Sequence, residues 1–356
     1  MKPLLDPAEF LMQQRKVTLL IPGFLGPADL KKITGALDDL ALAELELFLS
    51  RAAFVRTAPS GFVDGLCGLF GLVAQAGGDL PVAALTRMAD VGQSSSQFWL
   101  RADPVHLKAD RDRVVMFGNR QLNVTAAEAA QLVEEFNRLF ADDGVQLEAP
   151  TPNRWYLSVA QPPKIATTAL ADVMGQNIHP LLPRGEEAMA WHKLLNEAQM
   201  LFHTSAVNQR RELSGLPVIN SIWLWGGGVL AEPGEVKWQG VWSNEDLAIA
   251  LARFAGVAHG SAVPTAEDLL AQIETGEHLV VLDGATDAVQ FQDIGAWRQF
   301  IAGVSSDWIA PLLQALKRGE LAQLSVISTE GEHYSLTPAQ LRRWWKRRRS
   351  LLTFMS

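Results

Sequence analysis

The chain lacks the features that would tie it to a membrane or to an oxidising compartment. Its 356 residues include a single cysteine, Cys67, so no disulfide can form within the chain. No apolar run reaches the roughly 18 residues that a membrane-spanning helix needs. The opening MKPLLDPAEFLMQQRK has no apolar core of the kind found in secretory signals. These absences predict a cytoplasmic protein without a transmembrane segment.

Nucleotide-binding signatures are also missing, because neither a GxGxxG pattern nor a Walker loop occurs. The composition is otherwise that of a globular protein, with 48% hydrophobic and 20% charged residues. The length favours one large domain that carries an insertion.

Acidic residues are absent from the end of the chain. Residues 341–356 read LRRWWKRRRSLLTFMS, and their basic residues are Arg342, Arg343, Lys346, Arg347, Arg348 and Arg349. The formal net charge of the chain is −8, which leaves −14 on the remainder once these six positive charges are set apart. An acidic body argues against general nucleic-acid binding, which needs basic residues over the whole footprint.

The basic end is predicted to be a helix. Thr337-Pro338-Ala339-Gln340 has the order of an N-cap, a first-turn proline and a closing glutamine. A helix running on from there places Trp344 and Trp345 on one face and basic residues on the rest. Either the tryptophans dock this helix on the core, or the helix contacts an anionic membrane, a nucleic acid or a protein partner.

Short apolar runs alternate with capped helices at both ends of the chain. The runs that are typical of buried strands are Val17–Ile21, Val218–Trp225, Leu279–Leu282 and Leu324–Ile327. Helices with polar N-caps are expected to begin near Ser243 and Thr265. This alternation predicts an α/β fold with a largely parallel sheet and helices on both faces.

The middle of the chain has a different pattern. Thr125 and Glu128 form a capping box at the head of an amphipathic helix, and a second long helix is expected over residues 186–203. Prolines surround a short strand-like WYLSV between the two helices. We therefore expect an α+β insertion over residues 98–215, with the core built from residues 1–97 and 216–356.

One dense segment, residues 207–228, reads VNQRRELSGLPVINSIWLWGGG. In open α/β sheets, ligands bind beyond the carboxyl ends of strands, where glycines let a phosphate approach backbone N–H groups. A guanidinium group suits bidentate binding of phosphate or carboxylate. The segment predicts an anion site that is lined by Asn208, Arg210, Arg211, Asn220, Gly226, Gly227 and Gly228. The alternative is a plain strand and tight turn with both tryptophans in the core.

Several motifs together resemble a known family. They are Asn208 and Arg211 followed by Gly215, Pro217, Asn220, Trp225, Gly226 and Gly228, with PGFLGP at 22–27, RADPVHLKADRD at 101–112, RWYL at 154–157 and GQNIHPLLP at 175–183. This set resembles the archaeal-type cofactor-independent phosphoglycerate mutases of the alkaline phosphatase superfamily, and most closely their proteobacterial RpfE-type regulatory branch. The resemblance implies an alkaline-phosphatase-like α/β core that is interrupted by a substrate-covering domain.

The resemblance also implies two divalent metal ions, held by Asp and His, and a serine nucleophile. Here Pro22 stands at the first ligand position, Leu80-Pro81-Val82-Ala83 at the nucleophile motif, and Phe291 at a histidine ligand position. The remaining metal-ligand candidates are Asp287, Glu332 and His333. Losing several ligands abolishes phosphoryl transfer by such a mechanism.

Two functional expectations follow from the resemblance. The first is a bacterial pseudoenzyme without a metal cofactor, which binds a small anionic ligand or a partner in a regulatory role. The alternative is an active phosphoglycerate mutase or phosphohydrolase with two manganese or zinc ions on relocated ligands.

Overall fold

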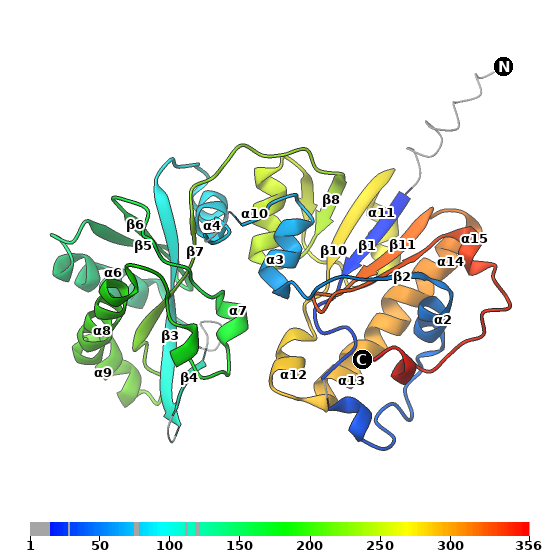
Figure 1. The fold of residues 1–356 in the computed structure, drawn as a ribbon, viewed down its shortest axis with the longest axis horizontal. Helices are drawn as coiled ribbons and strands as arrows, with labels where there is room; N and C mark the ends of the chain where they lie inside the picture. Colours follow the sequence, from blue (N-terminus) through cyan, green and yellow to red (C-terminus); the bar gives the residue numbers. More distant parts are fainter. Residues whose placement is uncertain (1–14, 28, 75–77, 111–112, 118–121, 356) are drawn as a thin grey trace. The chain divides into compact units, whose positions relative to one another are not determined.

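The structure, a computed structural model, describes residues 15–27, 29–74, 78–110, 113–117 and 122–355. It forms two compact units, each of which is described by itself (Figure 1). The first unit comprises residues 1–66 and 235–356, and the second comprises residues 67–234. The boundaries expected at 97/98 and 215/216 therefore differ from those of the units. The start of the chain, on which the expectation about secretion rests, lies outside the described residues.

The first unit is built on a seven-stranded sheet. In spatial order its strands are β2 (Ala53–Arg56), β12 (Glu332–Leu336), β11 (Gln323–Ile327), β1 (Arg15–Leu20), β10 (Gly276–Val281), β8 (Trp238–Trp242) and β9 (Ala258–Gly260). The strands from β11 to β9 run parallel, and β12 and β2 add an antiparallel edge. The predicted α/β class with a largely parallel sheet is confirmed.

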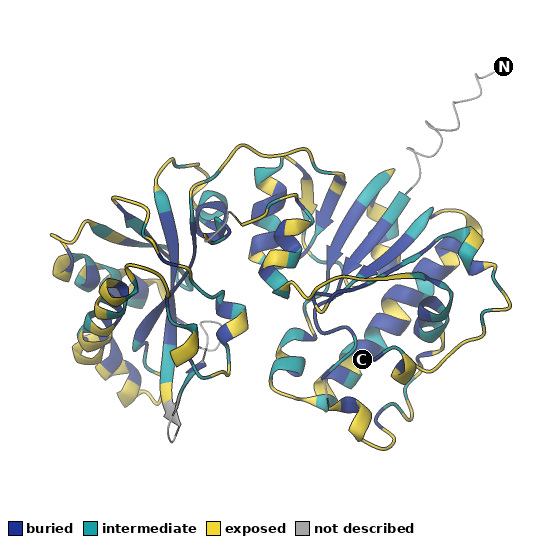
Figure 2. Cartoon of the chain, viewed as in Figure 1, coloured by how far each residue is buried: buried dark blue, intermediate teal, exposed yellow. Residues whose placement is uncertain are grey.

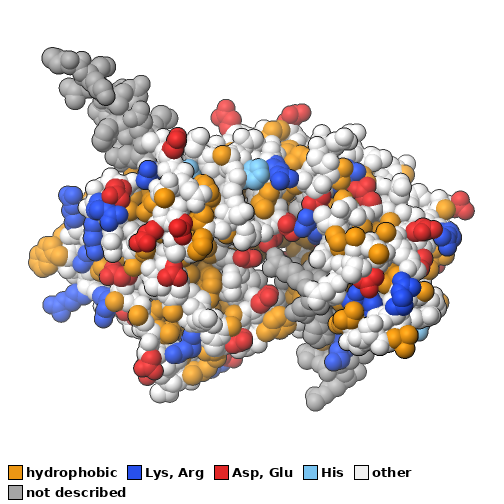
Figure 3. Space-filling model, turned by 180° about the vertical axis from the view of Figure 1, so that it is seen from behind, with side chains coloured by type: hydrophobic (Ala, Val, Ile, Leu, Met, Phe, Trp, Pro, Cys, Tyr) orange, Lys and Arg blue, Asp and Glu red, His pale blue; other side chains and the backbone are white. Residues whose placement is uncertain are grey.

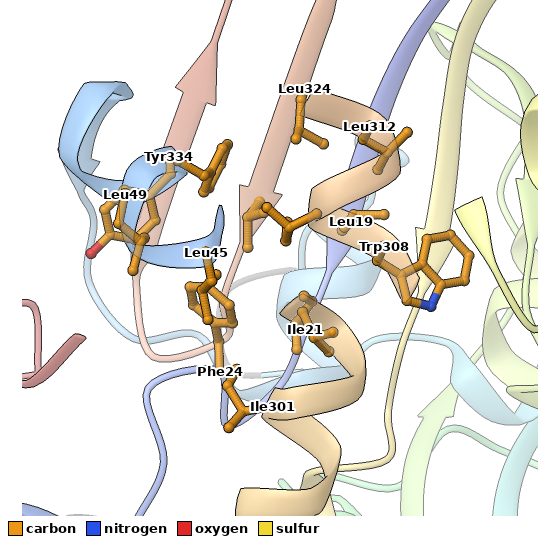
Figure 4. Packing of buried hydrophobic residues seen from close by; sticks show 14 of the residues in the cluster. Leu19, Ile21, Phe24, Leu45, Leu49, Ile301, Trp308, Leu312, Leu324 and Tyr334 are labelled. Atoms are coloured by element: carbon orange, nitrogen blue, oxygen red, sulfur yellow. The ribbon is translucent and has the colours of Figure 1, made fainter. Parts of the chain in front are cut away.

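Both faces of this sheet are buried, as the continuous apolar runs require. In β1, Val17 and Leu19 point into a large core cluster, whereas Leu20 is buried on the opposite face. Helices α2 (Ala43–Arg51), α11 (Ala266–Gln272), α13 (Ile294–Gly303) and α14 (Ala310–Arg318) supply the cluster from one side. Figure 4 shows its side chains, among them Leu19, Phe24 and Tyr334.

Helix α10 (Asp246–Phe254) packs against β8 and β9, on the other face of the sheet (Figure 1). The remaining elements of the first unit are short. They are α3 (Gly61–Gly68), α12 (Thr286–Gln290), α15 (Pro338–Leu341), the 3-10 turns Leu30–Lys32 and Leu351–Thr353, and a π-helical segment, Val304–Ile309, that joins α13 to α14.

Helix starts follow the polar caps at most of the expected positions. Thr265 caps α11 by accepting from the Asp268 N–H, and Thr125 and Glu128 form the expected capping box. Ser243 differs, because its hydroxyl accepts from the Glu245 N–H in a turn before the helix. Helix α10 consequently starts at Asp246.

The second unit contains a five-stranded antiparallel sheet that is formed by β4 (Arg113–Phe117), β3 (Phe98–Asp110), β6 (Arg154–Val159), β5 (Val145–Thr151) and β7 (Ser221–Gly228). Helices α6 (Ala126–Leu139), α8 (Ala188–Thr204) and α9 (Ala206–Leu213) gather beside it, and α4 (Val82–Val91) packs on β3 and β7 (Figure 1). The helix α7 (Leu170–Val173) and the 3-10 turn His179–Leu181 complete the unit.

The strand at the end of the dense segment lies in this second sheet. We expected Val218–Trp225 in the parallel sheet, which is wrong, because β7 pairs antiparallel with β3 and places Trp223 opposite Asp103. An apolar run shows that a strand is buried on both faces, but it carries no information about the direction of its neighbour. This pairing also explains why the unit boundary falls after β7.

The predicted C-terminal helix is wrong in its length. The capping box at Thr337 and Gln340 forms as expected, but α15 ends at Leu341. Continuing the helix would stack Arg342 on Lys346 and Arg343 on Arg347, and like charges at this spacing destabilise a helix. The segment after α15 is exposed along most of its length (Figure 2). None of the described helices is long and apolar enough to cross a membrane.

Candidate functional site

The carboxyl ends of the parallel strands in the first unit carry a cluster of polar residues. The loop after β1 brings Gly23 next to the loop after β11, and the Gly23 N–H donates to both carboxylate oxygens of Glu330, at 3.0 and 3.2 Å. The hydroxyls of Ser328 and Thr329 donate to the same carboxylate. Gly23 has a φ of +68°, and a Cβ there would lie 2.7 Å from Val289. This position therefore requires glycine.

A second glutamate closes the cluster on its antiparallel side. Glu332 begins β12 and is 3% exposed. It accepts from the Ser328 hydroxyl at 2.7 Å and lies 3.3 Å from the Arg56 guanidinium. Next to it, burial and then the Glu332 carboxylate raise the pKa of Tyr334 to about 12. We call Ser328, Thr329, Glu330 and Glu332 together the edge cluster.

The segment before α3 borders the edge cluster. The Thr57 N–H donates to the Gly331 carbonyl at 2.9 Å, and the Ser60 N–H donates to the Thr329 carbonyl at 3.1 Å. Ser60 is exposed and immediately precedes α3. Sequence reasoning missed this hydroxyl, because no periodic pattern links residues 57–60 to residues 328–332.

The metal-ligand candidates do not come together. Asp287 is exposed on α12, whereas His333 alternates with buried Glu332 and Tyr334 along β12 and so faces the other side of the sheet. Burial, then the charge of Lys237, lowers the pKa of His333. Over the described ranges, no three His, Cys, Asp or Glu side chains form a group suited to a metal. The candidates Asp287, Glu332 and His333 therefore do not form one ligand group in the described residues.

The residues Leu80–Ala83, which we aligned with the nucleophile motif, belong to the second unit. They lead into α4 of the second unit, where Ala83 packs with Ala84, Trp99 and Tyr156. Thr57 and Ser60 are exposed hydroxyl residues that the described part of the chain places next to the parallel-sheet edge.

The polar residues of the dense segment have internal partners. The Asn208 side chain donates to the Phe202 and Ile219 carbonyls and accepts from the Ile219 N–H, each at 2.8 Å. Asn220 bonds in the same way to both backbone groups of Leu107, at 2.7 and 2.8 Å. Such bonds hold β7 in register with its surroundings. They are typical of a structural network rather than of an open anion site.

The two adjacent arginines have different environments. Arg211 is 1% exposed and donates to the Glu128 carboxylate at 3.0 Å, to the Pro217 carbonyl at 2.7 Å and to the Leu122 carbonyl. Arg210 is exposed and donates to Gln131. Of the predicted anion-binding side chains, Arg210 alone points to solvent.

The glycine run fits close packing. A Cβ at Gly226 would lie 2.9 Å from Val82, and one at Gly228 would lie 2.6 Å from Pro81. The Gly226 N–H donates to the Thr167 hydroxyl, and the Gly227 N–H donates to Asp79. The glycines thus let β7 approach the start of α4, and two of their N–H groups already have acceptors.

A buried charge network in the second unit escaped sequence reasoning. Arg101 donates to Asp103 at 2.6 and 3.1 Å, and the Trp225 indole donates to the same carboxylate at 2.7 Å. Burial is the largest single influence and disfavours the Arg101 cation, but the charges of Asp103 and Tyr156 and the hydrogen bond to Asp103 together outweigh it and raise the pKa of Arg101. Arg101 belongs to the RADPVHLKADRD motif, whose residues 111 and 112 lie outside the described residues.

Two known proteins are similar in sequence to this chain. The chain is 28% identical to a probable 2,3-bisphosphoglycerate-independent phosphoglycerate mutase of Geobacter sulfurreducens over 234 residues, which is 63% of this chain and 58% of that protein. It is 30% identical to the 2,3-bisphosphoglycerate-independent phosphoglycerate mutase of Methanothrix thermoacetophila over 106 residues, 30% of this chain and 26% of that protein. The chain thus spans less than two thirds of the length of either relative. No protein-family model matches.

A solved structure agrees with the fold. The PH0037 protein of Pyrococcus horikoshii superposes with a TM-score of 0.56 and 12% identity, over 91% of this chain and 87% of its own. The cofactor-independent phosphoglycerate mutase of Thermoplasma acidophilum gives a TM-score of 0.47 and 16% identity, over 92% of this chain and 90% of its own.

Proposed function

Because the chain is a relative of the archaeal-type cofactor-independent phosphoglycerate mutases, we propose that it is a catalytically degenerate relative that regulates by binding. It binds a small anionic ligand or a partner and does not transfer a phosphoryl group. The narrower assignment to the RpfE-type branch stays a prediction.

The edge cluster supports the loss of catalysis. Phosphoryl transfer of this kind needs carboxylates that are free to coordinate cations next to the nucleophile. Glu330 is instead bonded to the Gly23 N–H and to two hydroxyls, and Glu332 is paired with Arg56. The Arg56 guanidinium places a positive charge 3.3 Å from the Glu332 carboxylate, which disfavours a cation at that carboxylate. These internal bonds lock the loops after β1 and β11 to each other.

A turnover assay tests the proposal. Interconversion of 3-phosphoglycerate and 2-phosphoglycerate is measured with excess Mn²⁺, Zn²⁺ or Mg²⁺, beside an active mutase as positive control. We expect no turnover above the protein-free rate. We also expect a calorimetric or thermal-shift response to phosphoglycerate or to another small anion. Turnover with any of the three metals would overturn the proposal.

A second candidate function is an active metal-dependent phosphotransferase on relocated ligands. The observation that favours it is the exposed hydroxyl of Ser60 beside the edge cluster. If this function holds, Ser60→Ala abolishes the metal-dependent turnover, whereas Ser306→Ala, at an exposed serine of the π-helical segment, leaves it intact. If the protein is catalytically inactive, neither Ser60→Ala nor Ser306→Ala changes a turnover rate, because there is no turnover.

A further inference from the structure

The C-terminal part of the first unit forms an exposed loop that is held at both ends. We call residues 342–350 the basic loop. Before it, Leu341 is buried and its carbonyl accepts from Arg51 at 2.6 Å. After it, Leu351 is fully buried and its N–H donates to Glu46 at 3.0 Å. Near its end, the Arg349 N–H donates to the Ser50 hydroxyl. The loop therefore projects from a fixed base on α2.

Two tryptophans stand at the tip of this loop. Trp344 is 79% exposed and Trp345 is 63% exposed. Tight backbone bonds, from the Trp344 N–H to the Arg342 carbonyl and from the Lys346 N–H to the Arg343 carbonyl, hold the tip. Large apolar side chains are usually buried. Two adjacent exposed tryptophans therefore indicate a surface that contacts another molecule.

Positive charge surrounds the tryptophans. Arg342, Arg343, Lys346 and Arg347 have no ion-pair partner within the described part of the chain, whereas Arg348 pairs with Glu46. Figure 3 shows Lys and Arg side chains gathered beside a protruding hydrophobic group on the first unit. Since the remainder of the chain carries −14, the loop concentrates positive charge on an otherwise acidic protein.

These features fit a lipid surface better than a nucleic acid. The indole rings meet edge to face, at 85° and 6.1 Å between centroids, so they offer no parallel platform on which successive bases could stack. A nucleic acid would also have to follow the acidic body over its footprint. A bilayer surface needs only the projecting tip, and tryptophan prefers the headgroup region, where its ring is buried and its N–H stays hydrated.

We propose that the basic loop docks the protein on anionic lipid surfaces. Trp344 and Trp345 enter the headgroup region, and the unpaired Arg342, Arg343, Lys346 and Arg347 bind lipid phosphates around them. This proposal does not depend on whether the edge cluster binds a ligand. It adds to the proposed regulatory function that the protein acts at an anionic lipid surface.

Vesicle sedimentation tests the proposal with the full chain. Binding is measured at low salt to vesicles of phosphatidylcholine mixed with phosphatidylglycerol, and to phosphatidylcholine alone. We expect binding to the mixed vesicles only, with a fall of about tenfold or more on raising salt to physiological strength, where the screening length is about 8 Å. Tryptophan emission shifts to shorter wavelength on binding, and this shift is lost in Trp344→Phe/Trp345→Phe.

Matched variants locate the contact. Arg342→Gln/Arg343→Gln/Arg347→Gln and Trp344→Ala/Trp345→Ala each lower binding about tenfold or more. The charge control neutralises Arg138, Lys164 and Lys193, which are exposed on the second unit. The apolar control is Met189→Ala/Met200→Ala, at residues that are 78% and 73% exposed. Both controls keep wild-type binding.

Three outcomes would overturn the proposal. They are a wild-type protein that does not bind the mixed vesicles at low salt, loop variants that bind like the controls, and binding to a single-stranded oligonucleotide in place of vesicles. Arg342, Trp344, Trp345 and Arg347 are exposed, and Arg343 is half-buried without an ion pair in the described residues. We therefore expect the circular dichroism and melting curves of the variants to match those of the wild type, which separates lost binding from lost folding.

Discussion

In the second unit, Arg101 and Arg211 are 5% and 1% exposed and bonded to Asp103 and Glu128, whereas in the basic loop of the first unit Arg342 and Arg347 extend into solvent. The same residue type thus has two physical roles. A buried guanidinium needs its carboxylate and carbonyl partners, since leaving either charge unpaired in the interior is costly. An exposed one is already hydrated and is free to bind something else.

This difference shows why an anion site inferred from residue type alone stays a prediction. Asn208, Arg211 and Asn220 are polar and clustered in the sequence, as ligand-binding residues often are. In the structure Asn208 and Arg211 bond to backbone groups of the turn between α9 and β7, and Asn220 bonds to the backbone of Leu107 in β3. A ligand-binding residue must keep a hydrogen-bonding group available for the ligand. Whether it does depends on its solvent exposure and on its hydrogen-bond partners, which the structure shows and the sequence does not.

The largest expected effect comes from the adjacent pair Arg211 and Arg210. Arg211→Ala removes the donors to Glu128 and Pro217 and leaves a buried gap, which we expect to cost about 3 kcal/mol of unfolding free energy. Arg210→Ala, one residue away on the exposed face, costs no more than about 0.5 kcal/mol. Urea unfolding with peptide-resolved hydrogen exchange measures both, because exchange reports the second unit separately.

Two results would break the comparison. Equal effects of the two substitutions would mean that the environments of Arg210 and Arg211 do not differ as described. An Arg211→Ala protein of unchanged stability that no longer binds a small anion would restore the ligand role that the sequence suggested.

The strands and helices were predictable where burial produces a recognisable pattern of apolar residues in the sequence. Val17–Ile21, Leu279–Leu282 and Leu324–Ile327 are apolar on both faces, which strands in a sheet covered by helices must be, and each is a strand of the parallel sheet. Val218–Trp225 has the same pattern but pairs with β3, because burial on both faces also occurs where α4 and α8 cover an antiparallel strand. Caps such as Thr125 and Thr265 were readable because their bonds are local.

The edge cluster was not predictable, since it depends on contacts between distant loops. Glu330 meets Gly23 only because β11 and β1 are parallel neighbours, and the bonded residues are 307 positions apart. Ser60 reaches the same edge through the pairing of β2 with β12. Pro22-Gly23 was the one local sequence signal at this edge. It predicted a tight turn, but it did not indicate which residue the turn would contact.

A smaller effect is expected from acid. Partial burial alone would raise the pKa of Glu128, but bonds from the Thr125 N–H and hydroxyl and from Arg211 outweigh it and lower the pKa. A lowered folded-state pKa gives stability that is complete above the unfolded value of about 4.3 and is lost as pH falls through the folded value. We therefore expect the second unit to lose stability from this group as pH falls below about 4.

Substitution separates this group from other acid effects. Glu128→Gln makes the fall in stability below about pH 4 shallower, because the glutamine does not titrate. Glu134→Gln, at an exposed position on the same helix, serves as the matched control and keeps the wild-type profile. Urea midpoints over an acid series measure both. An unchanged profile in Glu128→Gln would show that the Arg211–Glu128 pair adds nothing to stability.

The smallest effect should come from the basic loop. Neutralising Arg342, Arg343 and Arg347 with glutamine breaks no bond within the described residues and opens no cavity, so the unfolding free energy should change by no more than about 0.5 kcal/mol. Removal of like charges that lie next to each other could even raise it slightly at low salt, where repulsion is least screened. Urea unfolding at low and at high salt measures the change in unfolding free energy and its dependence on charge repulsion. Arg51→Met serves as the contrasting variant, because Arg51 donates to the Leu341 carbonyl at the base of the loop. Arg51→Met should destabilise the first unit by about 1 kcal/mol. If the triple variant instead lost as much as Arg51→Met, the loop arginines would be structural like Arg211, and the contrast between buried and exposed charges would no longer hold.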